Sequence, residues 1–509
     1  MVSENNKRIA KNTMLLYVRT LFSQLLALYT SRKILEIIGI EDFGIYNVVG
    51  GVTGLLTFLN GSMAVATQRF LTIELGKNDL KAYNRVFCMA YIIHIALALV
   101  ILIIAETIGL WFVNHCLNIP DERMVAANWI YQTSIAIMML SIIQTPYIAS
   151  LTAHEHMSIY AYVGMGESIL RLAVVFLLLI ASYDKLIVYG FMLLSIQLIA
   201  AMVYRGYCIK HFPECKYKWT WNKKLFHSLL GFTSWNLFGT IAWILKDQGN
   251  NMLMNIFGNP LINAARGVSY QVSNAVQNLV NGFSTAVNPQ LTKNYASDNQ
   301  EGLHKLMMLS SKLSFFLLLF LALPIIIEIS YILNLWLVEV PAYSALFTRI
   351  ILVEALCATF GGPMITSLLA TGHIKWYQIV VGSVMLLNVP VSYLLLRIGF
   401  PIETPLVVSL LITLLSFILR LWFCKHQLEL SVRTYLRSVI VPALTVAVIS
   451  SFLPIFTASL LNKGLLRLFI TLITSTISVS LCTYFIGLSK VEQLLVRNLI
   501  GKRLKKCIQ

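Results

Sequence analysis

A regular series of polar side chains interrupts one hydrophobic segment of the sequence, residues 261–288. This segment is long enough to cross a bilayer as a helix. Its polar residues step by three or four positions and therefore form one stripe along a helix. They are Arg266, Tyr270, Asn274, Gln277, Asn281, Ser284 and Asn288. Such a stripe cannot face lipid tails, so we expect it to face other helices or a water-filled cavity.

The stripe has donors and acceptors for two kinds of group. An arginine guanidinium binds phosphate oxygens bidentately, and uncharged amides and hydroxyls suit the hydroxyls of a sugar. Arg19 lies inside an earlier hydrophobic segment. Neither Arg19 nor Arg266 has an obvious acidic partner in its own helix or in the hydrophobic segments 43–67 and 226–252. We therefore expect both arginines to be unpaired and to face an anionic ligand. The alternative is that they bridge helices, or extend to the membrane surface, without touching substrate. The predicted substrate-binding residues are Arg19, Gln24, Asn47, Arg266, Tyr270, Asn274, Gln277 and Asn281.

The composition indicates the class of protein that must position these residues. The 509 residues are 58% hydrophobic and only 12% charged, with a mean hydropathy of +0.75, whereas soluble domains average about 25% charged residues. We predict an all-α integral membrane protein with 14 transmembrane helices. The predicted spans are 12–34, 43–67, 84–112, 124–151, 157–181, 186–207, 226–252, 261–288, 312–333, 344–370, 376–396, 404–424, 435–456 and 465–487.

The basic residues predict the orientation. Most of the 39 Lys and Arg residues fall in segments that are cytoplasmic if both termini are inside, which is the positive-inside pattern. This pattern also accounts for the net charge of +17, so nucleic-acid binding is not needed to explain it. The basic tail is expected to lie against anionic lipid headgroups.

An internal repeat divides the chain. The segment TPYIASLTAHEH at residues 145–156 aligns with GPMITSLLATGH at residues 362–373, and shorter matches recur at a similar shift. We predict two pseudo-symmetric six-helix lobes, residues 1–210 and 211–428, two extra helices in residues 429–487, and a cytoplasmic tail, residues 488–509. Transporters use paired lobes to expose a substrate site alternately to each side. An ancient duplication in a non-transporting membrane protein is the alternative.

Other charged and reactive residues point to structural roles. Glu167 and Arg171 are four residues apart and are expected to pair, and Glu328 is expected to be solvated near the outer surface. The eight cysteines form no CxxC pair, and His154, Glu155 and His156 lack a third ligand at a suitable spacing, so we predict no metal or cofactor. There is no GxxxxGK[ST] motif for ATP.

The sequence resembles one family of membrane transporters. A first span with a mid-helix arginine, the segment GIEDFGIYNVVGG at residues 39–51, and the TPYIASLTA and LNLWL segments are similar to Wzx-type polysaccharide flippases of the multidrug/oligosaccharidyl-lipid/polysaccharide exporter superfamily. The resemblance implies translocation of undecaprenyl-diphosphate-linked oligosaccharide across the bacterial inner membrane. It also implies that Arg19 and Arg266 lie on helices whose arginines line the cavity in related lipid II flippases.

The resulting hypothesis is a flippase that works by alternating access. Arg19 and Arg266 would hold the pyrophosphate while the polyprenyl tail stays in lipid, and a proton or sodium gradient would drive the cycle. One rival is a multidrug/cation antiporter of the same superfamily, which would need unpaired carboxylates. A second rival is a membrane glycosyltransferase or polymerase, which would need a long outer loop, and all predicted outer loops are short. The prediction is therefore a transporter and not an enzyme.

Overall fold

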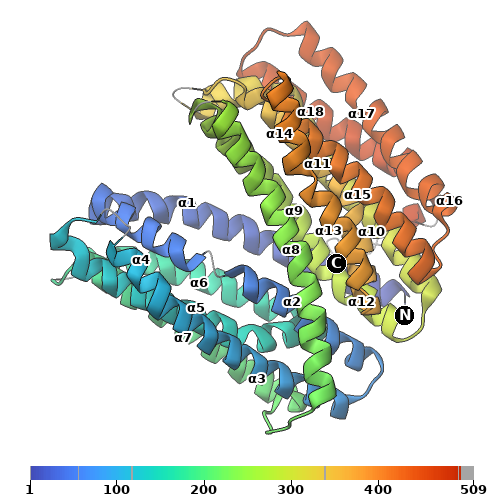
Figure 1. Ribbon diagram of the computed structural model, residues 1–509. Coiled ribbons are helices and arrows are strands. Elements are labelled where there is room, and N and C mark those ends of the chain that lie inside the picture. Colours follow the sequence, from blue (N-terminus) through green and yellow to red (C-terminus); the bar gives the residue numbers. More distant parts are fainter. Residues whose placement is uncertain are drawn as a thin grey trace, which may run out of the picture. The chain divides into compact units, whose positions relative to one another are not determined.

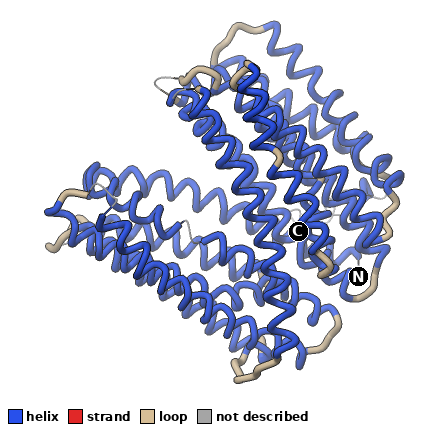
Figure 2. The backbone as a smooth tube through the Cα atoms, viewed as in Figure 1, coloured by secondary structure: helices blue, strands red, loops and turns tan. Residues whose placement is uncertain are grey.

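The computed structural model describes residues 2–54, 57–115, 119–180, 182–258, 260–337, 340–490 and 492–494. Within its helices, side chains are described except at residues 2–11, 28, 31, 32, 35, 40, 41, 43, 44, 47, 48, 51–54, 57–59, 255, 260, 261, 263, 264 and 279. The described chain is helical, as Figure 2 shows, and contains no strand. It divides into two compact units, residues 12–237 and residues 238–509 with residues 1–11. The division falls within one long helix, α8 (Lys223–Phe257).

The N-terminal unit is built from seven helices and the beginning of α8 (Figure 1). They are α1 (Val2–Gly54), α2 (Thr57–Gly76), α3 (Leu80–Ile104), α4 (Leu110–His115), α5 (Met124–Ala153), α6 (Met157–Leu177) and α7 (Lys185–His211). A π-helical turn, η1 (Ala105–Gly109), joins α3 to α4 without a break. Asp79 and Asp184 cap the N-termini of α3 and α7 by accepting backbone N–H bonds, as short polar side chains commonly do.

Helix α1 is two helices joined at one glycine. Gly39 has φ 86° and ψ 168°, a conformation that side chains with a Cβ rarely adopt. Just beyond it, Arg123 of the short helix η2 (Asp121–Arg123) donates to both carboxylate oxygens of Asp42, at 2.8 and 2.6 Å, and to Asp184 at 2.6 Å. One guanidinium therefore ties together three segments that are far apart in sequence, at the end of the unit where the first two predicted spans meet.

The C-terminal unit contains the rest of α8 and the helices that follow it. They are α9 (Pro260–Ala296), α10 (Gln300–Trp336), α11 (Ser344–Thr359), α12 (Gly361–Thr371), α13 (Lys375–Leu386), α14 (Asn388–Ile398), α15 (Thr404–Leu428), α16 (Val432–Tyr435), α17 (Val441–Leu460) and α18 (Leu465–Cys482), with π-helical turns η4 (Leu436–Ile440) and η5 (Thr483–Gly487). Helices α11 and α12 are bent by 43° at their junction. The repeat-related segment lies in the unbroken helix α5, so the repeats differ in the bend that precedes the second copy of the motif. In both copies the serine four residues after the proline, Ser150 or Ser367, donates to the proline carbonyl at 2.9 Å.

Ten described helices are long and apolar enough to cross a membrane, and α11 with α12 makes an eleventh if the bent pair is one span. The chain is therefore a multi-pass membrane protein. Helices α1, α2 and α9 are not among these eleven, and the predicted count of fourteen is not reached by hydropathy and length alone. Helix α9 falls short because its polar residues lower its mean hydropathy below that of a lipid-facing span.

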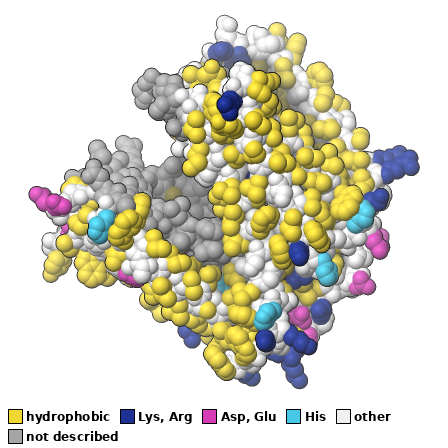
Figure 3. Space-filling view, viewed as in Figure 1, with side chains coloured by type: hydrophobic (Ala, Val, Ile, Leu, Met, Phe, Trp, Pro, Cys, Tyr) yellow, Lys and Arg dark blue, Asp and Glu magenta, His cyan; other side chains and the backbone are white. Residues whose placement is uncertain are grey.

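The exposed surface of the helices is largely hydrophobic, as lipid contact requires. On α17 the exposed apolar residues recur at helical spacing and form one lipid-facing stripe, Val441, Leu444, Val448, Phe452, Phe456 and Leu460. Figure 3 shows hydrophobic side chains over most of the described surface in view, with charged side chains mainly toward its edges.

Buried ion pairs join α10 to α18 and to the segment that follows α18. Glu328 of α10 is only 2% exposed and accepts hydrogen bonds from Arg467 at 2.7 Å and Thr471 at 3.1 Å. Lys312, nearer the beginning of α10, donates to Glu492 at 2.7 Å. The expectation that Glu328 is solvated was wrong, because α18 covers it and supplies its counter-charge. Helices α17 and α18 therefore pack as part of the C-terminal unit.

Candidate functional site: a polar cavity and an amide stripe in the C-terminal unit

The polar face of α9 separates into two differently placed groups. Arg266, Tyr270 and Gln277 point into the C-terminal unit, whereas Asn274 and Asn281 are exposed. The reason is geometric, because a helix turns about 100° per residue and Asn274 therefore lies about 80° around the axis from Arg266. The exposed residues continue as a second line at steps of three and four, here called the amide stripe: Gln271, Asn274, Asn278 and Asn281.

Arg266 is ion-paired inside its own unit. Its Nη2 lies 2.6 Å from Asp247 Oδ1 and 2.9 Å from the Asp247 carbonyl oxygen, and its guanidinium stands over the Tyr270 ring at 4.2 Å from the centroid. The residue is 6% exposed. The prediction that Arg266 has no acidic partner was wrong. Asp247 is near the outer end of the seventh predicted span, and sequence alone does not show that it turns toward α9.

A second buried pair lies beside the first. Lys246 Nζ is 2.8 Å from Glu354 Oε1 of α11, and the hydroxyls of Ser409 and Thr413 on α15 donate to the same carboxylate oxygen at 2.8 Å each. The adjacent residues Lys246 and Asp247 thus find their counter-charges on two different helices. Every carboxylate held inside the C-terminal unit's described helices, namely Asp247, Glu328 and Glu354, has a basic partner.

These two pairs border a polar cavity of about 260 Å³. Predicted residues Tyr270 and Gln277 line it, together with Asn250, Gly362, Ser416 and Arg420. Gln277 also donates to Ser273 at 2.8 Å, one turn earlier on α9. Sequence reasoning missed Arg420, which is only 7% exposed. A signal was present, because Ser409, Thr413, Ser416 and Arg420 step by four, three and four and so share one face of a helix.

Arg19 is held within the N-terminal unit by α6. Its guanidinium lies over the Tyr160 ring at 4.2 Å from the centroid, and Gly164 leaves room for it, because a Cβ there would lie 2.2 Å from Arg19 Nε. Glu167, one turn further along α6, interacts electrostatically with Arg171 and with Arg19. The acidic neighbour of Arg19 therefore comes from the fifth predicted span, outside the segments in which no partner was expected. Among the remaining predicted residues, Gln24 is half-buried and the Asn47 side chain lies outside the described residues.

His154, Glu155 and His156 form a turn that packs against the end of α7 and the connection between α7 and α8. His154 Nε2 lies 3.0 Å from Glu214 and its ring stacks on Phe212 at a centroid distance of 4.0 Å. His156 shares a hydrogen bond with the Tyr207 hydroxyl at 3.0 Å. No cluster of three or more His, Cys, Asp or Glu positioned for a metal occurs in the part of the chain that the structure describes.

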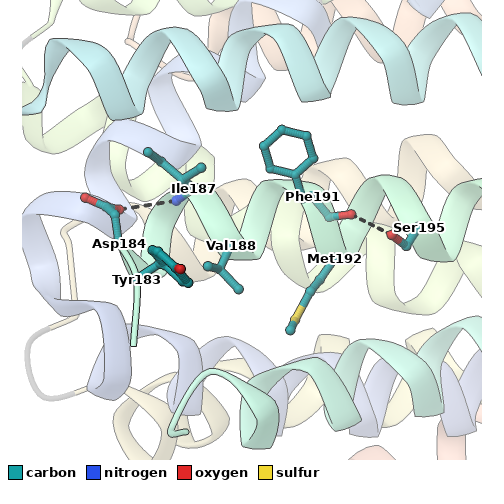
Figure 4. A pocket seen from close by; sticks show the side chains of 7 residues that line it. All are labelled: Tyr183, Asp184, Ile187, Val188, Phe191, Met192 and Ser195. Atoms are coloured by element: carbon teal, nitrogen blue, oxygen red, sulfur yellow. Dashed lines mark hydrogen bonds between the residues drawn. The ribbon is translucent and has the colours of Figure 1, made fainter. Parts of the chain in front are cut away.

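A larger hollow, of about 400 Å³, lies along α7 but is almost entirely apolar. Figure 4 shows Val188, Phe191 and Met192 lining it, while the Asp184 carboxylate turns to the Ile187 N–H and Ser195 bonds to its own helix. Its few polar groups are already satisfied, so lipid tails suit it better than a polar substrate.

Comparison of the whole structure with known structures identifies the fold. A multidrug resistance MATE family transporter of the MOP superfamily, in an outward-facing conformation, superimposes with a TM-score of 0.73 at 12% sequence identity. The match covers 84% of this chain and 97% of that one. The chain has the MATE transporter fold. A MOP superfamily transporter from Pyrococcus furiosus, whose binding pocket is described as having reversed polarity and suggesting a different function, matches with a TM-score of 0.71 at 12% identity, over 84% of this chain and 97% of that one.

Comparison of the sequence alone finds no match. No protein-family model matches the chain, and no curated protein matches it. Both matched structures are described as transporters, and at this level of identity the likeness shows the fold.

Proposed function

We propose that the chain is a flippase that carries undecaprenyl-diphosphate-linked oligosaccharide across the bacterial cytoplasmic membrane by alternating access, for cell-surface polysaccharide synthesis. In this proposal it has fourteen spans with both termini cytoplasmic, arranged as six-helix lobes at residues 1–210 and 211–428, two extra helices in residues 429–487 and a tail from residue 488. A proton or sodium gradient supplies the driving force.

The observation that supports this substrate best is the amide stripe of α9. Four uncharged amides lie exposed in one line on a helix of a membrane protein, where lipid contact is unfavourable and a water-filled path is required. Amides both donate and accept hydrogen bonds, as sugar hydroxyls do. A row of them can therefore replace water around a glycan as it passes, without holding it tightly at any one point.

The state of the buried carboxylates supports the flippase over a multidrug/cation antiporter. Asp247, Glu328 and Glu354 are neutralised by Arg266, Arg467 and Lys246 respectively. A cationic drug would have to displace a buried basic side chain from its carboxylate, which is costly. A neutral glycan meets no such competition.

The proposed role of Arg19 and Arg266 in holding the pyrophosphate now requires an exchange of partners. Arg266 would leave Asp247, and Arg19 would leave the Tyr160 ring, when the phosphates arrive. Tyr270 and Gln277 are then the neighbouring polar contacts on α9, and Gln24 and Asn47 are the proposed contacts from the first two spans. Exchange of this kind would make binding depend on the substrate's charge.

The deciding experiment is genetic. Deletion of the gene should cause lipid-linked oligosaccharide to accumulate on the cytoplasmic side, and the wild-type gene should restore export. A variant with Asn274→Leu and Asn281→Leu should fail to restore it, while Ala275→Leu, which adds a leucine on the same exposed side without removing an amide, should succeed. Normal export in the deletion strain, combined with increased susceptibility to cationic drugs, would favour the antiporter instead.

A matched pair of variants tests the arginine. Arg266→Gln alone leaves Asp247 as a buried unpaired carboxylate, whereas Arg266→Gln with Asp247→Asn restores the charge balance. If Arg266 holds the pyrophosphate, the double variant should be as stable as wild type yet still unable to export. Recovery of export in the double variant would show that Arg266 is only structural.

A further inference from the structure

The charges around the polar cavity of the C-terminal unit do not balance. Two pairs are complete, Lys246 with Glu354 and Arg266 with Asp247. Arg420 also lines the cavity and is 7% exposed, and its Nε donates to the Tyr377 hydroxyl at 3.4 Å. No carboxylate in the described part of the chain pairs with Arg420. The five charged groups therefore sum to one positive charge, and a buried uncompensated charge is costly.

Of the hydroxyl groups on the face of α15 toward this cavity, two are hydrogen-bonded and one is not. Ser409 and Thr413 donate their hydroxyls to Glu354. Ser416 continues the same face, is fully buried, and its hydroxyl has no hydrogen-bond partner. Arg420 follows four residues later, so Ser416 and Arg420 are neighbours on the helix surface. An unused hydroxyl thus lies beside the unpaired guanidinium.

There is space beside these two donors. A Cβ added at Gly362 would meet no atom within 4 Å, so the backbone of α12 borders open volume there, and Gly362 lines the cavity. At Gly361 a Cβ would lie 2.8 Å from Arg420 Nη1, which places the guanidinium directly against the bend between α11 and α12. The cavity of about 260 Å³ can hold one small ion with several waters, each of which needs about 30 Å³.

We propose that Arg420 and Ser416 bind a small monovalent inorganic anion, of the size of chloride, in this cavity. The anion supplies the missing negative charge and accepts hydrogen bonds from the Ser416 hydroxyl and the Arg420 guanidinium. Glu354 and Asp247, the acidic groups at the cavity, are already paired and do not compete for Arg420. The Tyr377 hydroxyl that accepts from Arg420 is neutral, as is Tyr270, which lines the cavity. The site shares its cavity with Tyr270 and Gln277, but binding of the anion does not depend on the proposed flippase activity.

A phosphate group of a lipid-linked substrate shares the chemistry of this site, since it also accepts hydrogen bonds from a guanidinium. A pyrophosphate carries at least two negative charges, however, and would overcompensate the single positive charge. Inorganic pyrophosphate is therefore the second arm of the test.

The test measures the unfolding temperature of the purified full chain in phosphatidylcholine nanodiscs at constant ionic strength. Chloride, bromide or nitrate in place of gluconate should raise it by about 3 °C once the anion is at ten times its Kd. The rise should vanish in Arg420→Gln, shrink in Ser416→Ala, and persist in Arg397→Gln, which removes an exposed arginine from the same unit. Gly362→Val, which fills the space without touching the charge, should also abolish it.

Three results would overturn the proposal: no difference between chloride and gluconate in the wild-type protein, an undiminished rise in Arg420→Gln, or stabilisation through Arg420 by pyrophosphate but not by chloride. If Arg420→Gln does not fold, Ser416→Ala and an anomalous-scattering peak from bromide-soaked crystals decide the matter. A bromide peak at Arg420 supports the site, and a fully occupied peak elsewhere with none at Arg420 refutes it.

Discussion

Removing one partner of the Lys246–Glu354 ion pair should destabilise the protein far more than removing both. The two atoms are 2.8 Å apart, and the side chains are only 9% and 16% exposed. In Lys246→Met the long side chain is replaced by an apolar one of similar shape, so packing is kept while Glu354 loses its counter-charge. The hydroxyls of Ser409 and Thr413 remain hydrogen-bonded to Glu354.

The expected magnitude follows from these contacts. Leaving one buried charge unpaired costs about 3–5 kcal/mol. Two retained hydrogen bonds to the charged oxygen place Lys246→Met toward the lower end, at about 3 kcal/mol. For a unit of this size, at about 2 °C per kcal/mol, the unfolding temperature should fall by about 6 °C. The double variant Lys246→Met, Glu354→Leu has no buried charge left and should lie within about 1 kcal/mol of wild type.

Thermal unfolding of the full chain in nanodiscs, followed by intrinsic fluorescence, measures this double-mutant cycle. The control is Lys305→Met at the exposed pair with Glu301, whose side chains are 71% and 79% exposed, and it should leave the unfolding temperature unchanged. The reasoning would be refuted if Lys246→Met behaved like this control. It would equally fail if the double variant lost as much stability as the two single variants added together.

Three further predictions rest on other contacts. Burial raises the pKa of the Cys215 thiol to about 12, so Cys215 should resist alkylation at pH 8 while an introduced Lys216→Cys at the exposed neighbouring position reacts. Because of the raised pKa, the free energy of unfolding should fall as the pH rises from about 9 to 12, since only the unfolded thiol ionises in that range. Rapid labelling of Cys215 in the folded protein would contradict the raised pKa. Gly164→Val should cost about 1–3 kcal/mol in thermal unfolding by colliding with Arg19. Adding Arg19→Ala should restore most of that stability, and no recovery would show that the crowding lies elsewhere. Glu328→Gln should lower the free energy of unfolding by about 2 kcal/mol, less than for a fully buried pair because Arg467 is partly solvated. It should also accelerate amide hydrogen exchange in α18. Unchanged exchange there would show that the ion pair does not hold α18 in place.

Some features of the fold were predictable because they depend on local chemistry. A charged content of only 12% and long apolar runs require membrane helices. Among the described residues, ten or eleven helices are long and apolar enough to cross a membrane. The serine and proline of the repeated motif recur with the same hydrogen bond in α5 and α12. Gly39 marks the break between the first two helices, where a left-handed conformation favours glycine.

The candidate site was predictable only in part. The polar face of α9 was visible as a spacing pattern, and Tyr270 and Gln277 do line a polar cavity. The pattern treated that face as one surface, however, and the structure places Asn274 and Asn281 outside the unit's interior. Arg420 lies near the end of the predicted span 404–424 and was not among the predicted site residues, although it is buried.

Composition and residue spacing were enough to predict a helical membrane protein, a polar side of α9, and the residues that share a helix face. These properties follow from composition and from the helical repeat, and they need no knowledge of neighbouring helices. The ion pairs depend on how the helices pack and are seen only in the tertiary structure. They are Arg266 with Asp247, Lys246 with Glu354 and Arg467 with Glu328. The physical reason is that a helix's sequence specifies the direction of a side chain around its own axis, whereas a partner 108 or 139 residues away depends on how the helices pack. Because of this packing, Arg266 of α9 forms an ion pair with Asp247. Arg420 has no carboxylate partner among the described residues.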